Sequence, residues 1–390
     1  MCQTWLVSWK RGIWIPGQQE SLSSRVMSPR AGVPCARVQL GPGNNSTDLD
    51  GPAIPRNTEE RPQPEKNAHA RKADRQSQCH RSTGPGDDPR VEMQSGPGLS
   101  DPGATIVKNT AVLLLSCPDR KGLVAAIANF LLAYEANILH ADQHQDGALG
   151  LFLMRVEWDL HGFSLPLADF PRMFAPIAEK HQMIWRLAES AHKPRMAIFA
   201  SRHDHCLADL LYRYQGGELY CEIPVIISNH EHVRRLADAC GVPYQHIEVT
   251  RDNKEEVERA QLALLRECDV DFIVLARYMQ VLSENFTAQY PERIINIHHS
   301  FLPAFHGAKP YHRAFERGVK LIGATSHYVT NVLDEGPIIE QDVARISHRD
   351  TVEDLVQKGA DLEKIVLSRA VRWHLDNRVL VYANKTVVFD

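Results

Sequence analysis

Two polar residues, Asn296 and His298, alternate with apolar residues in one short stretch, and an acidic residue, Asp334, follows downstream before Gly336. A carboxamide can donate a hydrogen bond to a carbonyl oxygen, and an imidazole can move a proton. A carboxylate can hold a water molecule or a charged imidazole. If the two segments converge in the fold, these residues predict an enzyme that acts on a small carbonyl group.

The apolar stretch 294–298 predicts a buried strand, in which residues two apart point to the same face. Asn296 and His298 can therefore face one cavity, whereas His299 is expected on the opposite face as a structural histidine. Two plainer readings stay open. Asn296 can bond neighbouring backbone, and Asp334 can simply cap its own turn.

Further histidines at positions 306, 312 and 327 make a cleft histidine more plausible and also permit a metal site. No His-x3-His pair or accompanying cysteine supports metal, so none is expected. The eight cysteines include no Cys-x-x-Cys pair, which argues against a zinc knuckle and against a disulfide framework. Free thiols in a reducing compartment are the expectation.

The chain has 390 residues, of which 43% are hydrophobic, with a formal net charge of −4. This length favours two folded domains plus additional sequence. The mild charge argues against nucleic acid or an anionic membrane as the main partner. No apolar stretch is long enough to cross a bilayer, and Lys10 and Arg11 interrupt the apolar beginning of the chain. A cytoplasmic location is expected.

Residues 1–105 predict a disordered extension, because positions 18–105 are rich in Pro, Gly, Ser, Asn, Arg and Glu and show no regular hydrophobic period. One interpretation is a genuine tail with a targeting or binding role. The favoured one is upstream sequence translated from a mistaken start, with the true start near Met93. The arginines leave a transit peptide open, although the acidic residues argue against it.

Residues 106–190 predict a first folded domain with the order β-α-β-β-α-β. A four-stranded antiparallel sheet with both helices on one face is the expected result. The predicted strands are 109–117, 138–145, 151–158 and 183–187, and the predicted helices are 123–134 and 167–181.

Beyond a polar hinge at 189–194, residues 194–390 predict a second domain in which short apolar strands alternate with amphipathic helices. This rhythm indicates an α/β, Rossmann-like, mostly parallel sheet with helices on both faces, whose ligands bind at the carboxyl ends of the strands. The predicted strands are 195–200, 222–228, 245–249, 272–275, 294–298, 321–329 and 338–345, and the predicted helices are 206–214, 233–240 and 254–266.

Residues 294–342 closely resemble the formyltetrahydrofolate deformylase family within the folate-dependent formyltransferases. The motifs are Asn-Ile-His-His-Ser-Phe-Leu-Pro-Ala-Phe-His-Gly-Ala-Lys-Pro-Tyr-His at 296–312, Gly-Ala-Thr-Ser-His-Tyr-Val at 323–329 and Leu-Asp-Glu-Gly-Pro-Ile-Ile at 333–339. The resemblance extends from about position 109 to the C-terminus. It includes a first domain that looks like an ACT module, a ferredoxin-like regulatory fold.

The resemblance implies a hydrolase acting on a C–N bond, which converts 10-formyltetrahydrofolate and water to formate and tetrahydrofolate without a further cofactor. It implies catalytic roles for Asn296, His298 and Asp334, and recovery of free folate and supply of formate for purine biosynthesis. The segment 276–283 corresponds to the folate-binding segment. Its named contact residues are Tyr278, Met279, Val281 and Leu282.

For the ACT-like domain the resemblance implies a homo-oligomer and an amino-acid effector, with glycine and methionine as the expected ligands. The regulatory residues would be Asp119, Gly122 and Asn137. A dimerisation surface without a ligand is an open alternative, because any tight strand-to-helix turn also requires a glycine such as Gly122.

Two rival functions differ in the expected acceptor. A formyltransferase that acts on a phosphorylated amine would need a Gly-rich phosphate loop after the first strand of the second domain, whereas residues 200–206 contain no glycine. Water is therefore the favoured acceptor, although Arg202 keeps the transferase alternative open. A catalytically silent amino-acid sensor is the third possibility, and the presence of Asn296, His298 and Asp334 together argues against it.

Overall fold

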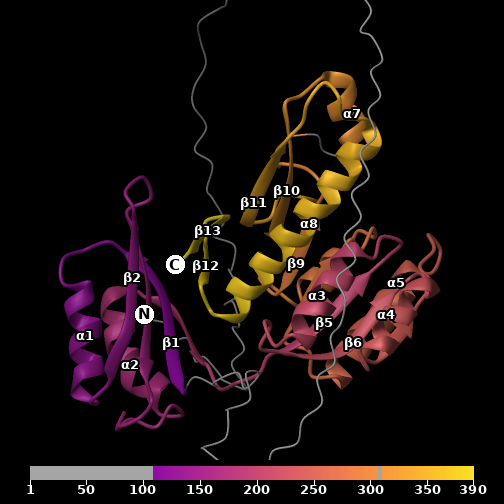
Figure 1. Ribbon diagram of the computed structural model, residues 1–390. Coiled ribbons are helices and arrows are strands. Elements are labelled where there is room, and N and C mark those ends of the chain that lie inside the picture. The colour runs from indigo at the N-terminus through magenta and orange to yellow at the C-terminus, as the bar shows by residue number, and fades with distance from the viewer. Residues whose placement is uncertain (1–108, 305–309) are drawn as a thin grey trace, which may run out of the picture. The chain divides into compact units, whose positions relative to one another are not determined.

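The computed structural model describes residues 109–304 and 310–390, which contain two main sheets that follow one another along the chain (Figure 1). The predicted extension over residues 1–105 lies outside the described residues. The first sheet is formed by residues 110–189 and the second begins at residue 195.

The first sheet has the strand order β2-β3-β1-β4 and is antiparallel throughout. α1 and α2 lie together on one of its faces and share an apolar core with it (Figure 1). This arrangement is the predicted β-α-β-β-α-β unit, while its assignment to the ACT class stays a prediction. The elements are β1 (Thr110–Pro118), α1 (Leu123–Ala133), β2 (Asn137–Asp146), β3 (Leu151–Asp159), α2 (Phe170–His181) and β4 (Ile184–Glu189).

β1 and β2 differ sharply in burial, and their sequences explain why. The apolar run from Ala111 to Leu115 is at most 2% exposed, so both faces of β1 are covered. β2 lies at the edge of the sheet and is exposed over nearly its whole length, which fits its alternating histidine, glutamine and aspartate residues. A continuous apolar run thus marks the central strand and a polar one marks the edge.

The second sheet has the order β11-β10-β9-β8-β5-β6-β7. The five strands from β9 to β7 are parallel, whereas β10 runs antiparallel to both of its neighbours. The prediction of a mostly parallel sheet is confirmed. The strands are β5 (Arg195–Ala200), β6 (Glu222–Ser228), β7 (Tyr244–His246), β8 (Phe272–Ala276), β9 (Ile294–His298), β10 (Leu321–Tyr328) and β11 (Ile338–Arg345).

Helices cover both faces of this sheet. α3, α4, α7 and α8 share a core with one face, and α5 and α6 share a core with the other. The helices are α3 (His205–Gln215), η1 (Glu231–Val233), α4 (Arg234–Ala239), α5 (Lys254–Glu267), α6 (Glu284–Thr287), α7 (Pro310–Arg317) and α8 (Val352–Leu375), and a hairpin of β12 (Val379–Tyr382) and β13 (Lys385–Val388) follows.

The structure differs locally from the sequence predictions at three places. The strand expected at 245–249 is only β7, because it borders the sheet at its edge and pairs over three residues. The helix expected at 233–240 is α4, which is preceded by the 3-10 turn η1. α8, which was not predicted from the sequence, begins at a capping box in which Thr351 and Asp354 bond each other's backbone.

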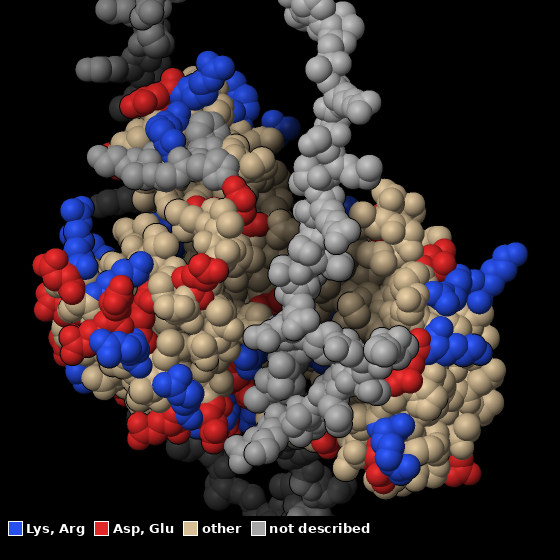
Figure 2. Space-filling model, turned by 180° about the vertical axis from the view of Figure 1, so that it is seen from behind, with Lys and Arg blue, Asp and Glu red and all other residues tan. Residues whose placement is uncertain are grey.

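Charged side chains of both signs are interspersed over the described residues that are visible in Figure 2. In the described part of the chain, no helix combines the length and the apolar character that crossing a membrane requires.

Candidate active site

The candidate site is built where β9 ends beside β10. In this antiparallel pair, Asn296 lies directly opposite His327, and His298 lies opposite Thr325. Asn296 and His298 are two residues apart on one strand, so their side chains lie on the same face of the sheet. The position of the strand end is the predicted one.

Asp334 comes to this face from the connection between β10 and β11. Its Oδ1 lies 3.2 Å from Nδ1 of His298, and the two side chains are only 12% and 7% exposed. Nε2 of His298 is buried and has no hydrogen-bond partner among the described residues. The carboxylate therefore holds one side of the imidazole and leaves the other side available to a reacting group. The structure thus brings together the three residues that were singled out in the sequence.

His327 fixes the orientation of the Asn296 amide. Its Nδ1 lies 2.9 Å from the carbonyl oxygen of Tyr328, which can only accept, so Nδ1 carries the hydrogen. Burial, above all, lowers the pKa of His327, so the ring is neutral and its Nε2 accepts from Nδ2 of Asn296 at 3.2 Å. One N–H of Asn296 is thereby engaged, and the second remains for a ligand.

His327 was singled out from the sequence only as one of several further histidines. The position of His327 opposite Asn296 follows from the register of β9 and β10. That register cannot be derived from the sequence without knowing that the two strands pair. Asn296 contacts this imidazole through Nδ2, so the plainer reading, an amide that satisfies neighbouring backbone, does not describe this contact.

The loop that carries Asp334 is pressed against β10 at Gly336. A Cβ at this glycine would lie 1.7 Å from the carbonyl oxygen of Tyr328 and 3.4 Å from Nδ1 of His327. Asp334 itself has a φ of 59°, a left-handed conformation that aspartate tolerates better than most residues. Gly336 thus allows the loop backbone to approach β10 closely, and this approach positions the Asp334 carboxylate.

His299 does not occupy the opposite face as predicted, because β9 ends at His298. Its ring centroid lies 5.1 Å from that of His298, and the side chain stays partly exposed. Burial, followed by the charges of Arg277 and His298, lowers the pKa of His299 to about 3. The ring of His299 is therefore neutral near pH 7 and lies beside that of His298.

The predicted folate segment follows β8. Tyr278 is 6% exposed, its ring packs edge-on against Phe199, and its hydroxyl accepts a hydrogen bond from Gln261, so little of the residue is open to a ligand. Met279 and Val281 are each 54% exposed and present apolar surface. Leu282 is intermediate, and it lines a small hollow together with Tyr278 and Val281.

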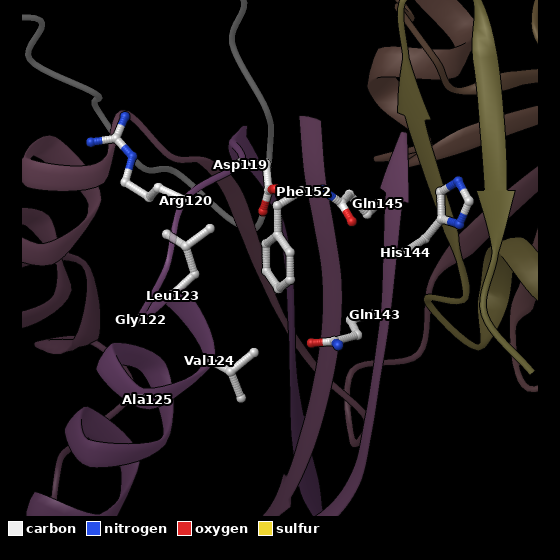
Figure 3. A pocket seen from close by; sticks show the side chains of 10 residues that line it. All are labelled: Asp119, Arg120, Gly122, Leu123, Val124, Ala125, Gln143, His144, Gln145 and Phe152. Carbon is white, nitrogen blue, oxygen red and sulfur yellow. Dashed lines mark hydrogen bonds between the residues drawn. The ribbon is translucent and has the colours of Figure 1, made fainter. Parts of the chain in front are cut away.

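Two of the three predicted regulatory residues line a separate hollow of about 590 Å³ in the first domain (Figure 3). Asp119 accepts a hydrogen bond from Gln145 at 2.5 Å. Gly122 has a φ of 91°, and a Cβ at this position would meet nothing within 4 Å, so the turn alone requires glycine there. Asn137 begins β2 and is not among the lining residues.

Figure 3 shows how the hollow is formed between α1 and β2. Gln143 and Gln145 extend from β2 toward the helix, whereas His144, one residue between them, points away. Val124 comes from the first turn of α1 on the other side. The hollow therefore combines an apolar helix wall with amide groups.

A second polar cluster next to the site could at first sight hold a metal. His205, Cys206 and Glu363 offer three ligand atoms within 4.8 Å of one another. However, Nε of Arg277 lies 3.2 Å from Oε2 of Glu363, and burial raises the pKa of the Cys206 thiol well above its usual value. The positive charge of Arg277 repels a metal cation, and a protonated thiol is a poor metal ligand. The cluster is therefore an ion-pair network and not a metal site.

Comparison with known proteins agrees with this geometry. Residues 194–371 match the family described as formyl transferase. A formyltetrahydrofolate deformylase from Synechocystis sp. is 55% identical over 280 residues, which cover 72% of this chain and 98% of the relative. One from Bacillus subtilis is 52% identical over 279 residues, covering 71% and 93%.

A crystal structure of a formyltetrahydrofolate deformylase from Pseudomonas syringae matches with a TM-score of 0.72 at 49% identity, covering 74% of this chain and 96% of that chain. Fold and site together define a protein of the formyltransferase fold, with a mostly parallel sheet and an Asn-His-Asp site at a strand end. Within this class, the chain belongs to the formyltetrahydrofolate deformylase family.

Proposed function

We propose that the protein hydrolyses 10-formyltetrahydrofolate to formate and tetrahydrofolate, with Asn296, His298 and Asp334 as its catalytic residues. The observation that carries this proposal is the 3.2 Å contact between Nδ1 of His298 and Oδ1 of Asp334. It leaves the buried Nε2 of His298 without a partner among the described residues, on the strand face shared with Asn296.

In the proposed reaction, the oxygen of a water molecule bonds to the formyl carbon and the bond from that carbon to N10 breaks. The second N–H of Asn296 donates to the formyl oxygen as it gains negative charge, which contributes about 3 kcal/mol in the transition state. The attacking water gives a proton to Asp334 or to His298, and His298 passes a proton to N10 through Nε2, so that formate and tetrahydrofolate form. Asp334 orients the imidazole and holds the attacking water.

Water rather than an amine is the proposed acceptor. The connection between β5 and α3, at positions 201–204, holds an arginine, a histidine and an aspartate but no glycine. The hydroxyl of Ser201 in this connection donates to the side chain of Asn229. A formyltransferase acting on an amine remains the alternative, with Arg202 as its only proposed phosphate contact.

The variant Asp334→Asn tests the assignment. Removing the charge from this position should lower kcat by about 10²-fold or more and leave folate binding largely intact. Formate release and the Kd for tetrahydrofolate are the measurements. The matched control is Asp342→Asn, which changes a half-buried aspartate on β11 that pairs with Arg369, and it should keep wild-type turnover. Near-normal turnover in Asp334→Asn would rule out the assigned role.

Folate contacts are proposed for the segment after β8. Met279 and Val281 offer exposed apolar side chains to the pterin, and Tyr278 and Leu282 contribute mainly through their backbone and their packing. The site residues supply the proton transfers and the hydrogen bonds themselves, so the proposal includes no metal or other cofactor.

The first domain is proposed to bind an amino-acid effector, glycine or methionine, in the hollow beside Asp119 and Gly122. The amide groups of Gln143 and Gln145 in this hollow, together with the carboxylate of Asp119, can bind the charged groups of an amino acid. Calorimetric titration with each amino acid is the test. Absence of heat for both would favour a pure association surface.

The remaining proposals concern the oligomeric state, the location and the metabolic role of the protein. The exposed edge strand β2 is a place where a second copy could pair, in line with the expected homo-oligomer. A cytoplasmic location and a supply of formate and free folate to purine biosynthesis are proposed on the family resemblance.

A further inference from the structure

Arg277 is a buried cation that the reaction described above does not use. It directly follows β8, is 8% exposed and has a φ of 60°. Its Nε and Nη1 atoms are buried without a hydrogen-bond partner among the described residues. Burying such groups without partners is costly. Left-handed backbone is uncommon in residues other than glycine.

Glu363 on α8 neutralises only one side of this guanidinium. Its Oε2 lies 3.2 Å from Nε of Arg277, while the carboxylate also accepts from Tyr311 at 2.8 Å and bonds His205 at 2.7 Å. Burial opposes ionisation, but the His205 bond and the Arg277 charge outweigh it and lower the pKa of Glu363. The carboxylate is thus ionised and shared among three partners, whereas Nη1 of Arg277 has no described hydrogen bond.

Arg277 is also within electrostatic reach of the reacting groups. Its charge lowers the pKa of His299, whose ring lies 5.1 Å from that of His298. β8 and β9 are neighbouring parallel strands, so Arg277 and His299 both follow carboxyl ends at the same edge of the sheet. Hydrolysis of a formyl group creates a new carboxylate at this edge.

We propose that Nη1 of Arg277 binds the carboxylate of formate, the one-carbon anion that the proposed reaction releases. A guanidinium N–H matches a small carboxylate in charge and geometry. The glutamate tail of the folate carries the same chemical group, but an 8% exposed side chain suits a one-carbon anion better than a tail that extends to solvent. This inference rests on the proposed hydrolysis, whereas its test measures binding without turnover.

The experiment is titration of the full-length protein with sodium formate, followed by calorimetry or by broadening of the 13C-formate signal. Arg277→Gln should weaken formate binding by about tenfold or more, the loss of one charge-assisted hydrogen bond. Glu363→Gln should tighten it, because the competing negative charge disappears while the amide keeps a similar shape. These two changes of opposite sign in neighbouring residues are the result expected.

Arg293→Gln is the matched control. Arg293 is also partly buried with an unpaired Nε, but it precedes β9 and so lies at the other end of that strand. The Arg293→Gln variant should bind formate with the same affinity as the wild type. Arg277→Lys, which keeps the charge, should retain more formate affinity than Arg277→Gln, and Glu363→Gln carries the test if Arg277→Gln does not fold.

Three results would overturn the proposal. The first is absence of formate binding by a wild-type protein that still turns over. The second is equal weakening in Arg277→Gln and Glu363→Gln, which indicates a purely structural pair. The third is loss of p-aminobenzoylglutamate binding in Arg277→Gln with formate binding unchanged, which assigns Arg277 to the folate tail.

Discussion

Two adjacent histidines at the end of β9 have different surroundings. His298 faces Asp334 through Nδ1, while His299 lies beside Arg277 and has a pKa lowered to about 3 by burial and by that charge. His299 therefore stays neutral near pH 7 and adds no positive charge to the site. Strand alternation predicts His298 on the same face as Asn296, and the structure agrees. It predicts His299 on the opposite face, whereas the ring of His299 lies 5.1 Å from that of His298.

The lowered pKa of His299 predicts a pH effect on stability. The ordinary value is 6.5, so between about pH 6.5 and 3 the unfolded chain binds more protons at this residue than the folded one. The free energy of unfolding then falls as the pH is lowered through this window. His299→Gln should reduce that dependence by at most ~1.4 kcal/mol per pH unit.

Urea unfolding at about pH 7 and about pH 5 measures this dependence. The exposed His161 provides the control substitution His161→Gln. His374, whose pKa burial also lowers to about 3, keeps its own contribution in every variant. An unchanged dependence in His299→Gln would show that His299 is not buried as a neutral ring.

At the scale of elements, the β10–β11 connection decides where Asp334 lies. Gly336→Ala should lower kcat without removing any of the proposed catalytic side chains, because the new Cβ would lie 1.7 Å from the carbonyl oxygen of Tyr328 and must displace the loop. We expect a loss of about tenfold or more in turnover together with lower thermal stability. Steady-state kinetics and a thermal scan check both.

Gly147→Ala is the control for Gly336→Ala. A Cβ at Gly147, in the β2–β3 turn, would meet nothing within 4 Å. It should therefore leave turnover unchanged. Wild-type kcat in Gly336→Ala would show that the loop position does not control the placement of Asp334.

Much of this element arrangement follows from local pattern. Apolar runs such as 294–298 identify buried strands, and their parity places Asn296 and His298 together. Contacts between strands that are distant in the sequence cannot be derived from this local pattern. The bond from Asn296 to His327 requires the β9–β10 register, and the ion pair of Arg277 with Glu363 requires α8, which was not predicted from the sequence.

At the scale of the whole molecule, the proposed active site and the proposed effector site lie in different sheets. The Asn-His-Asp site lies in the second sheet, and the proposed effector hollow lies in the first. The prediction of a formyltetrahydrofolate deformylase from the motifs at 296–339 is confirmed by membership of that family. The effector and the oligomer stay predictions.

The most direct measurement is incubation of the purified full-length protein with 10-formyltetrahydrofolate in the absence of any amine. Formate and tetrahydrofolate are quantified over time, with Asp334→Asn measured in parallel. Release of the two products in equal amounts by the wild type, slowed by about 10²-fold in the variant, is predicted. Tetrahydrofolate release only after an amine is added, with a formylated amine as the second product, would contradict hydrolysis.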